Sequence, residues 1–316
     1  MTDNISNASR RFSPEEIKRR FLAVVLIPTA VFISLYFSPD IAEYAKVGLR
    51  LCYKAVIGSV FPFIVLTDIF VAYAHPERIT ILRVIFEKLF KINGRAISAT
   101  VLGMLCGFPI GVRVARRLYD DGTLSRDECE RLIGFSNNTG PAFAISAVGA
   151  SIRGSVRDGI IIYLSMLLAA VTVGIIFGIG KHPSYAPIKE RDAEFNLTES
   201  IKNAGTSTLS ICSCVVFFSV IDGLAKHFIK NELIYLFLSP LLEVTGAEAA
   251  IAAIDIRSPA LSLALAAFAL SFSGFSVHMQ AKAFLSGTDL RMKTYYLEKL
   301  AQGLIAAAIS VTFIII

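Results

Sequence analysis

Charged side chains are scarce in this sequence, and tryptophan is absent. Of its 316 residues only 18% are charged, whereas 54% are hydrophobic, and the mean hydropathy is +0.63. A soluble domain normally carries about 25% charged residues. Apolar runs such as Phe21–Phe37, preceded by basic residues, instead suit helices that cross a bilayer. The composition therefore excludes an ordinary soluble protein and predicts an all-α, multi-pass integral membrane protein.

Cysteine is also sparse, and the five cysteines are an odd number. Most of them lie in or beside apolar segments, where reduced cysteines pack as small hydrophobic side chains. This distribution excludes a disulfide framework. Cys212 and Cys214 have no other Cys or His nearby at metal-ligand spacing, so we expect helix packing there. We expect neither a metal nor another cofactor in the protein.

The sequence lacks the short motifs of common enzymes. It contains no Gly-rich phosphate loop, no His-Glu-x-x-His and no Gly-x-Ser-x-Gly. The carboxylates between residues 120 and 130 stand among arginines and are expected to form solvated ion pairs. We therefore expect no catalytic residues and no enzyme. The net charge of +6 is not gathered in a compact basic domain, so nucleic acid is not an expected partner.

Interrupted apolar segments dominate the stretch Leu102–Val148. The interruptions are Gly-Phe-Pro-Ile-Gly at 107–111 and Ser-Asn-Asn-Thr-Gly-Pro at 136–141, and nine formal charges lie between residues 113 and 130. Gly and Pro release backbone N–H and C=O groups from a helix, and in hydrocarbon these groups need protein, water or a solute as partners. Broken helices of this kind often border the solute site of a transporter.

We divide the chain into five parts. Residues 1–20 form a polar tail, 21–46 the first membrane span and a loop, 47–180 the first membrane half, 181–205 a polar linker and 206–316 the second membrane half. The first span ends in Ser-Pro-Asp and not in a small-residue cleavage site, so we interpret it as uncleaved. Asp68 lies inside the second span, where it needs a partner or water unless it reaches the membrane interface.

The second half repeats signals of the first. Gly107-Phe108 is echoed by Gly274-Phe275, Gly122-Thr123 by Gly287-Thr288, and Glu130-Arg131 by Glu298-Lys299. We therefore expect about eight to ten helical segments, several of them broken or re-entrant, in two related halves that enclose a central site. Whether the second half is inverted relative to the first depends on whether segments 78–92 and 233–245 cross the membrane or only dip into it. Hydropathy does not distinguish these two arrangements.

The candidate binding site combines the residues of these breaks with polar residues beside them. It comprises Gly107, Pro109, Gly111, Arg113, Asn137, Asn138, Thr139, Gly140 and Pro141 from the first half and Ser276, His278, Gln280 and Lys282 from the second. Amides and hydroxyls suit a polar planar solute or a small ion, and Arg, Lys and a titratable His suit an anion. Helix packing is the alternative for the Asn-Asn-Thr group and the His, and cytoplasmic-flank charge is the alternative for Arg113 and Lys282.

Four motifs resemble a known family. They are GFPIG at 107–111, LYDDGTLSRDECERLIGFSNNTGPAF at 118–143, LLEVTG at 241–246, and SFSGFSVHMQA at 271–281 followed by TDLR at 288–291. The pattern is similar to that of the YlbJ-type sporulation integral membrane proteins, which carry the nucleoside-recognition or Gate domain of nucleoside transporters. The resemblance implies two Gate-like halves, a permease-like protein in a bacterial cell membrane, and a nucleoside-like or dipicolinate-like solute.

Two functions fit these observations. The first is transport of a small polar or anionic solute, and the alternative is a membrane scaffold or assembly component of the spore or cell envelope that transports nothing. An intramembrane enzyme has no catalytic set in the sequence to support it. Membrane lipid and a small-molecule solute are the expected partners, and a homo-oligomer is one alternative for the assembly state.

We predict that the N-terminal tail lies in the cytoplasm. Five basic residues precede the first apolar run, and positive charge beside a span is retained on the cytoplasmic side. A fluorescent protein that matures only in the cytoplasm should therefore be bright when fused before Met1, and an alkaline phosphatase fused there should be inactive. An active phosphatase with a dark fluorescent fusion would place the tail outside.

Overall fold

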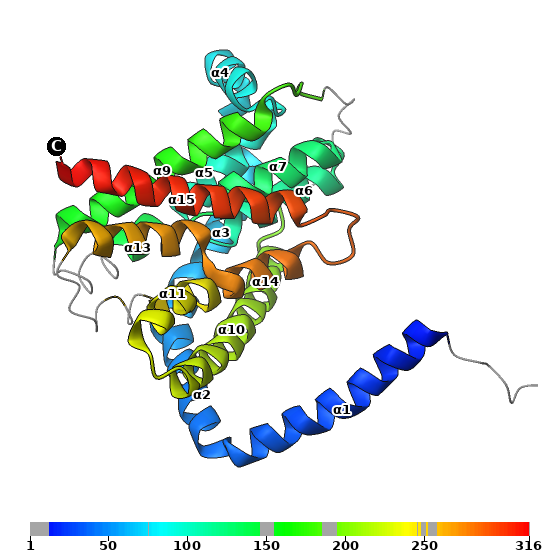
Figure 1. The fold of residues 1–316 in the computed structure, drawn as a ribbon. Helices are drawn as coiled ribbons and strands as arrows, with labels where there is room; N and C mark the ends of the chain where they lie inside the picture. The colour runs from blue at the N-terminus through cyan, green and yellow to red at the C-terminus, as the bar shows by residue number, and fades with distance from the viewer. Residues whose placement is uncertain are drawn as a thin grey trace, which may run out of the picture.

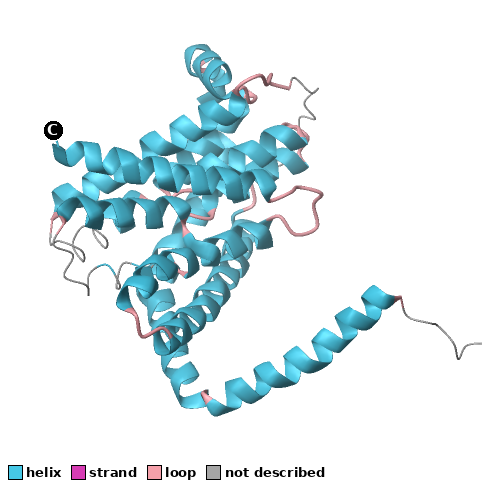
Figure 2. Ribbon diagram, in the orientation of Figure 1, coloured by secondary structure: helices cyan, strands magenta, loops and turns pink. Residues whose placement is uncertain are grey.

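The computed structural model describes residues 13–74, 76–145, 155–184, 195–244, 246–247, 251 and 258–315, and no strand occurs among them (Figures 1 and 2). The α-helices are α1 (Pro14–Tyr36), α2 (Ser38–Leu51), α3 (Gly58–Tyr73), α4 (Thr80–Phe90), α5 (Ile97–Leu105), α6 (Ile110–Asp120), α7 (Arg126–Ser136), α9 (Val156–Gly178), α10 (Leu197–Phe228), α11 (Glu232–Leu242), α13 (Pro259–Phe272), α14 (Gly274–Phe284) and α15 (Lys293–Ile315). A π-helical turn, Cys52–Ile57, joins α2 to α3. The predicted all-α class is confirmed.

Several helices in the described part are long and apolar enough to cross a bilayer. Three qualify by length and composition, namely α9, α10 and the run Pro259–Phe284 that contains α13 and α14. The consecutive helices α1 and α2 form a further candidate, a span bent by 85° at its centre. These lengths agree with the predicted polytopic membrane protein.

Helix α1 projects from the helical body (Figure 1). It begins with a capping box in which the Ser13 hydroxyl accepts from the backbone of Glu16, and the Glu16 carboxylate accepts from the backbone of Ser13. Its apolar side chains are exposed along its length, for example Phe21 at 68% and Phe32 at 71%. An apolar helix that exposes this much surface is suited to contact with lipid.

The body of the molecule is organised around α15, which packs on α13, α9 and α7 (Figure 1). One apolar cluster joins α3 to α7 through residues such as Ile64 and Ile133, and a second joins α9 to α13 through residues such as Met166 and Leu270. Helix α10 packs along α2 and α3 and also contacts α14. Apolar packing therefore positions the broken segments against α15.

The echoed sequence signals have the same backbone conformation in both halves. Gly107 and Gly274 both have positive φ, at 86° and 63°, and so do Gly122 and Gly287, at 72° and 80°. A positive φ favours glycine because it has no Cβ. The order of helix, glycine break, short helix, glycine turn and helix is therefore the same in α5–α6–α7 and α13–α14–α15. An inverted relation between the halves stays a prediction.

The two glycine turns meet at charged tips, which we define as residues 116–126 and 284–291. The Arg116 guanidinium donates to the carbonyl oxygens of Phe284 and Ser286, at 2.6 and 2.7 Å. The Tyr119 hydroxyl donates to Asp289 at 2.6 Å, and this hydrogen bond holds the pKa of Asp289 below its usual value. The tips therefore join the first half to the second through polar contacts.

Helix α10 begins inside the stretch predicted as polar linker. The Asn196 side chain accepts from the backbone N–H of Glu199, and this N-cap starts the helix at Leu197. Hydropathy alone assigns these residues to a linker because the first turns of α10 are polar. The first segment of that linker is also ordered by contacts with α7, since Lys181 lies 2.8 Å from Asp127.

We predict that the close approach of α5 to α7 tolerates no side chain at Gly103. A Cβ there would collide with the carbonyl oxygen of Ser136 and lie 2.8 Å from the Cα of Gly111. Overpacking of this kind costs about 1–3 kcal/mol, so Gly103→Ala should lower the thermal unfolding temperature in detergent. Gly205→Ala is the control, because a Cβ on that helical glycine meets nothing within 4 Å. Equal unfolding temperatures for the two variants would contradict the predicted close contact.

Candidate functional site

The break after α7 is buried although it is irregular and polar. Helix α7 starts with a capping box formed by Ser125 and Glu128 and ends at Ser136. Asn137 and Asn138 are 0% exposed. The residue before a proline is disfavoured in helix, so Gly140-Pro141 prevents a continuous helix here. Because the break lies inside the protein, its released backbone groups need internal partners.

Side chains of α15 supply those partners. The Lys299 ammonium donates to the carbonyl oxygen of Asn137 at 2.6 Å and to the side-chain oxygen of Gln302 at 2.9 Å. The Gln302 amide donates to Asn138 Oδ1 at 2.7 Å, and the Asn137 amide donates to the Tyr295 hydroxyl at 3.0 Å. We call Asn137, Asn138, Tyr295, Lys299 and Gln302 the Asn–Lys network.

The break between α13 and α14 borders this network. The Thr139 hydroxyl lies 3.5 Å from the carbonyl oxygen of Leu270 near the end of α13. His278 Nε2 lies 2.8 Å from the carbonyl oxygen of Phe272, and the His278 ring centroid lies 5.2 Å from that of Tyr295. The structure therefore brings the Asn-Asn-Thr segment and His278 to the same region, with α15 between them.

Many buried polar atoms around the network have no hydrogen-bond partner in the described part of the chain. They include Asn137 Oδ1, Ser136 Oγ, Ser271 Oγ, Ser276 Oγ, His278 Nδ1 and both carboxylate oxygens of Glu298. Buried polar atoms in folded proteins are almost always paired. Their concentration on the segments around the network marks this region as the candidate functional site.

The glycines of the first half hold its two breaks together. A Cβ on Gly107 would lie 3.0 Å from the amide nitrogen of Gly140, so the backbones of the two breaks are in close contact. Pro109 precedes α6, and Gly111 packs against Ser136. These predicted site residues therefore shape the break, and the polar groups come from their neighbours.

Arg113 and Lys282 lie apart from the network. Arg113 forms a bidentate ion pair with Asp68, at 2.6 and 2.9 Å, and the Ser200 hydroxyl donates to the same carboxylate at 2.7 Å. Lys282 is exposed in the last turn of α14, whereas Gln280 is buried on that helix. A carboxylate buried in α3 needs a counter-charge, which explains why Arg113 is held by Asp68 and not by the network.

A second buried carboxylate, Asp222 in α10, is also paired. It accepts from the Tyr235 hydroxyl at 2.8 Å and from the Ser239 hydroxyl at 2.9 Å. It follows Phe217 by five residues, as Asp68 follows Phe63 in the first half, but its hydrogen-bond partners are neutral. Both halves therefore contain such a buried acid, which is paired with an arginine in the first half and with two hydroxyl groups in the second.

Sequence reasoning missed four polar residues of α15, namely Tyr295, Glu298, Lys299 and Gln302. Glu298 and Lys299 enter the sequence-based prediction only as the echo of Glu130-Arg131 in the first half. A stronger signal was available, because Tyr295, Glu298 and Gln302 recur three and four residues apart and so share one face of a helix. All four side chains are 0% exposed.

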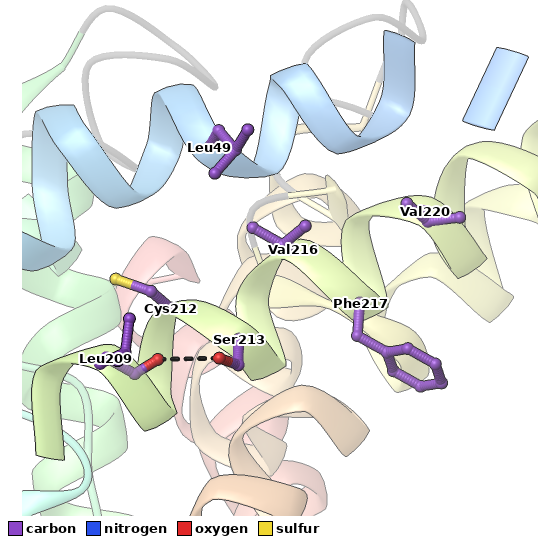
Figure 3. A pocket seen from close by; sticks show the side chains of 7 residues that line it. All are labelled: Leu49, Leu209, Cys212, Ser213, Val216, Phe217 and Val220. Carbon is purple, nitrogen blue, oxygen red and sulfur yellow. Dashed lines mark hydrogen bonds between the residues drawn. The ribbon is translucent and has the colours of Figure 1, made fainter. Parts of the chain in front are cut away.

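An apolar groove lies elsewhere on the molecule, between α2 and α10 (Figure 3). It has a volume of about 480 Å³ and is lined by Leu49, Leu209, Cys212, Ser213, Val216, Phe217 and Val220. The one hydroxyl in the lining, that of Ser213, donates to the Leu209 carbonyl of its own helix at 3.0 Å. The lining therefore suits an apolar group better than a polar solute.

Comparison with known proteins supports the membrane assignment. The chain is similar to the sporulation integral membrane protein YlbJ of Bacillus subtilis (strain 168), with 25% identity over 308 aligned positions that cover 84% of this chain and 75% of the relative. No family model and no solved structure matches the chain. The YlbJ-type resemblance and the integral membrane class are thus confirmed, while the Gate domain stays a prediction.

We predict that Gln302→Leu destabilises the protein. The change keeps the approximate size of the side chain but leaves Asn138 Oδ1 and one Lys299 N–H without their partner, at a cost of about 1–3 kcal/mol for each buried unpaired group. Thermal unfolding in detergent measures the effect. Thr312→Val is the control in the same helix, because Thr312 is exposed and bonds only to the carbonyl of Ile309 in its own turn. Unchanged stability in both variants would show that the network contributes nothing to folding.

Proposed function

We propose that this protein transports a small polar or anionic solute across a membrane, and that the Asn–Lys network is its solute site. The observation that carries the proposal is the environment of Lys299. This fully buried ammonium has three N–H donors, and two of them bond to Asn137 and Gln302. The third donor is left for an oxygen atom of the solute.

The neighbouring groups favour a solute that presents oxygen atoms. The Tyr295 hydroxyl accepts from Asn137, so its own proton is free to be donated. A carboxylate that accepts from Lys299 and Tyr295 would gain two hydrogen bonds, one of them charge-assisted. When His278 Nε2 donates to Phe272, its Nδ1 becomes an acceptor for a solute N–H or O–H. Small aromatic dicarboxylates such as dipicolinate offer carboxylate oxygens for Lys299 and Tyr295, whereas nucleosides offer the O–H and N–H groups that suit His278 Nδ1.

The arrangement of breaks supports alternating access. In each half a helix is interrupted at a glycine with positive φ, and the two interrupted segments border the network. In transporters, movement of one such half against the other exposes a central site to either side in turn. The chain's relative is named as a sporulation protein, so we place this transport in sporulation.

The first test is uptake into proteoliposomes that contain the purified protein. We expect time-dependent uptake from a panel of dipicolinate, other small dicarboxylates and nucleosides. Lys299→Met should reduce that uptake by about 10–100-fold, because a hydrogen bond that involves a charged group is worth about 1.5–3 kcal/mol. Asn138→Ala should reduce it by about 2–10-fold, because it removes the neutral hydrogen bond that positions Gln302 beside Lys299, worth about 0.5–1.5 kcal/mol. Both variants must be compared with the wild-type protein at matched protein levels.

Ser213→Ala is the matched control for these variants. It also removes a polar group from a membrane helix, but Ser213 lies in the apolar groove and not at the network. Its uptake should equal that of the wild-type protein. If no panel solute is taken up and none raises the thermal unfolding temperature, the scaffold function replaces transport, because a scaffold has no need to bind a small molecule.

A further inference from the structure

Glu298 is a buried acid whose carboxylate accepts no well-formed hydrogen bond within the part of the chain that the structure describes. Its side chain is 0% exposed, and neither oxygen accepts a hydrogen bond from any residue that the structure describes. The carboxyl group lies against the backbone of α7 at Gly134, where an added Cβ would come within 2.6 Å of Glu298 Cδ. The absence of a side chain at Gly134 therefore makes the space that the carboxyl group fills.

The other buried acids in the described part of the chain are all bonded. Glu128 accepts from the backbone N–H groups of Asn93, Ser125 and Ser184, at 2.8–2.9 Å. Asp68 accepts from Arg113 and Ser200, Asp222 from Tyr235 and Ser239, and Glu243 from the backbone of Gly246. Glu298 differs from these residues because it is buried and no described residue donates a hydrogen bond to it. Packing of the helices alone therefore does not explain why an acid stands at this position.

The charged groups around Glu298 are occupied elsewhere. On α7, Arg131 donates to Asp127 and to the carbonyl oxygens of Phe90 and Lys91. On α15 itself, Lys299 donates to Asn137 and Gln302, and adjacent residues of a helix do not face each other. Helix α13 has no titratable residue, and the titratable residues of α9 are Arg157, Asp158 and Tyr163.

We infer that Glu298 is a proton-binding site of the transport pathway. An ionised carboxylate without a partner is very unfavourable in a protein interior at membrane depth, whereas the protonated carboxyl is neutral. Glu298 therefore binds a proton when it is enclosed and releases it when movement of the halves admits water. The coupling of this proton to solute rests on the proposed function, but the protonation itself does not.

The position of Glu298 links the proton to an anion. Lys299 is the next residue along α15, and in the proposed site it binds the solute. A solute carboxylate at Lys299 and a proton on Glu298 add no net charge to the membrane interior, which lowers the cost of carrying both. A proton and an anion would therefore cross together.

Infrared difference spectroscopy of the protein in lipid nanodiscs tests protonation directly. At neutral pH the wild-type protein should show the C=O band of a protonated carboxyl, and the band should shift when glutamate is labelled with ¹³C. Glu298→Gln should lose the band. Glu130→Gln is the matched control from the first half and should keep it, because Glu130 bonds to Arg126 and to the backbone of Arg291 at 2.8 and 2.9 Å.

Three results would overturn the inference. The first is a wild-type spectrum without a ¹³C-sensitive carboxyl band at neutral pH, a measurement that needs no variant to fold. The second is a band that persists in Glu298→Gln. The third is a band that sodium chloride abolishes while potassium chloride does not, which would assign the carboxylate to a sodium ion.

Proton coupling is tested separately from protonation. For one proton per solute, an inward gradient of one pH unit should drive about tenfold accumulation of the transported panel solute in wild-type proteoliposomes. Glu298→Gln should lose this accumulation and retain exchange of labelled for unlabelled solute. Accumulation that Glu298→Gln preserves would overturn the coupling. Absence of any transport, with the Glu298 band present, would refute the proposed function and leave the proton site established.

Discussion

Every backbone group that a broken helix releases inside a membrane protein must find a partner, and the arrangement around α15 follows from this constraint. The break after α7 exposes the carbonyl oxygens of Phe135 and Asn137 to the interior, and they are bonded by Asn138 and Lys299. Asn137 and Asn138 are 0% exposed, so bulk water does not reach the break to replace those donors. Polar residues in the otherwise apolar α15 are therefore a requirement of the break, and the same residues create the solute site proposed here.

At equivalent positions, each half has a buried cation that donates hydrogen bonds to backbone carbonyl groups at the end of a helix. In the first half, Arg131 donates to the carbonyl oxygens of Phe90 and Lys91 at the end of α4. In the second half, the matching Lys299 donates to Asn137 at the end of α7. In both cases a buried cation in the middle of one helix donates hydrogen bonds to carbonyl groups at the C-terminal end of another helix. Its positive charge also complements the dipole of that helix. Arg131 carries a planar fork that fits two carbonyl groups, whereas the ammonium of Lys299 uses two of its three N–H donors on residues that the structure describes.

The sequence is sufficient to locate the helix breaks, but it does not identify which residues bond to the backbone groups that the breaks release. Glycine and proline act on the local backbone, so the interruptions near Gly107, Asn137 and Gly274 were predictable from the residues themselves. Partners across the fold were not, because nothing in the spacing shows that Arg113 pairs with Asp68, which lies 45 positions earlier in the chain. The polar face of α15 was overlooked for the same reason, since its meaning depends on where α7 ends.

The charged tips make the contact between the two halves sensitive to the ionic strength of the surrounding solution. Their contacts include the exposed pair Arg126 and Asp289, at 3.2 Å, with side chains 37% and 60% exposed. Charges this open to water are screened by dissolved ions, and the screening length falls from about 10 Å at 0.1 M salt to about 3 Å at 1 M. The Asn–Lys network, enclosed in the protein, is shielded from such screening. The ionic strength of the adjacent solution therefore acts on the junction between the halves without acting on the chemistry at its centre.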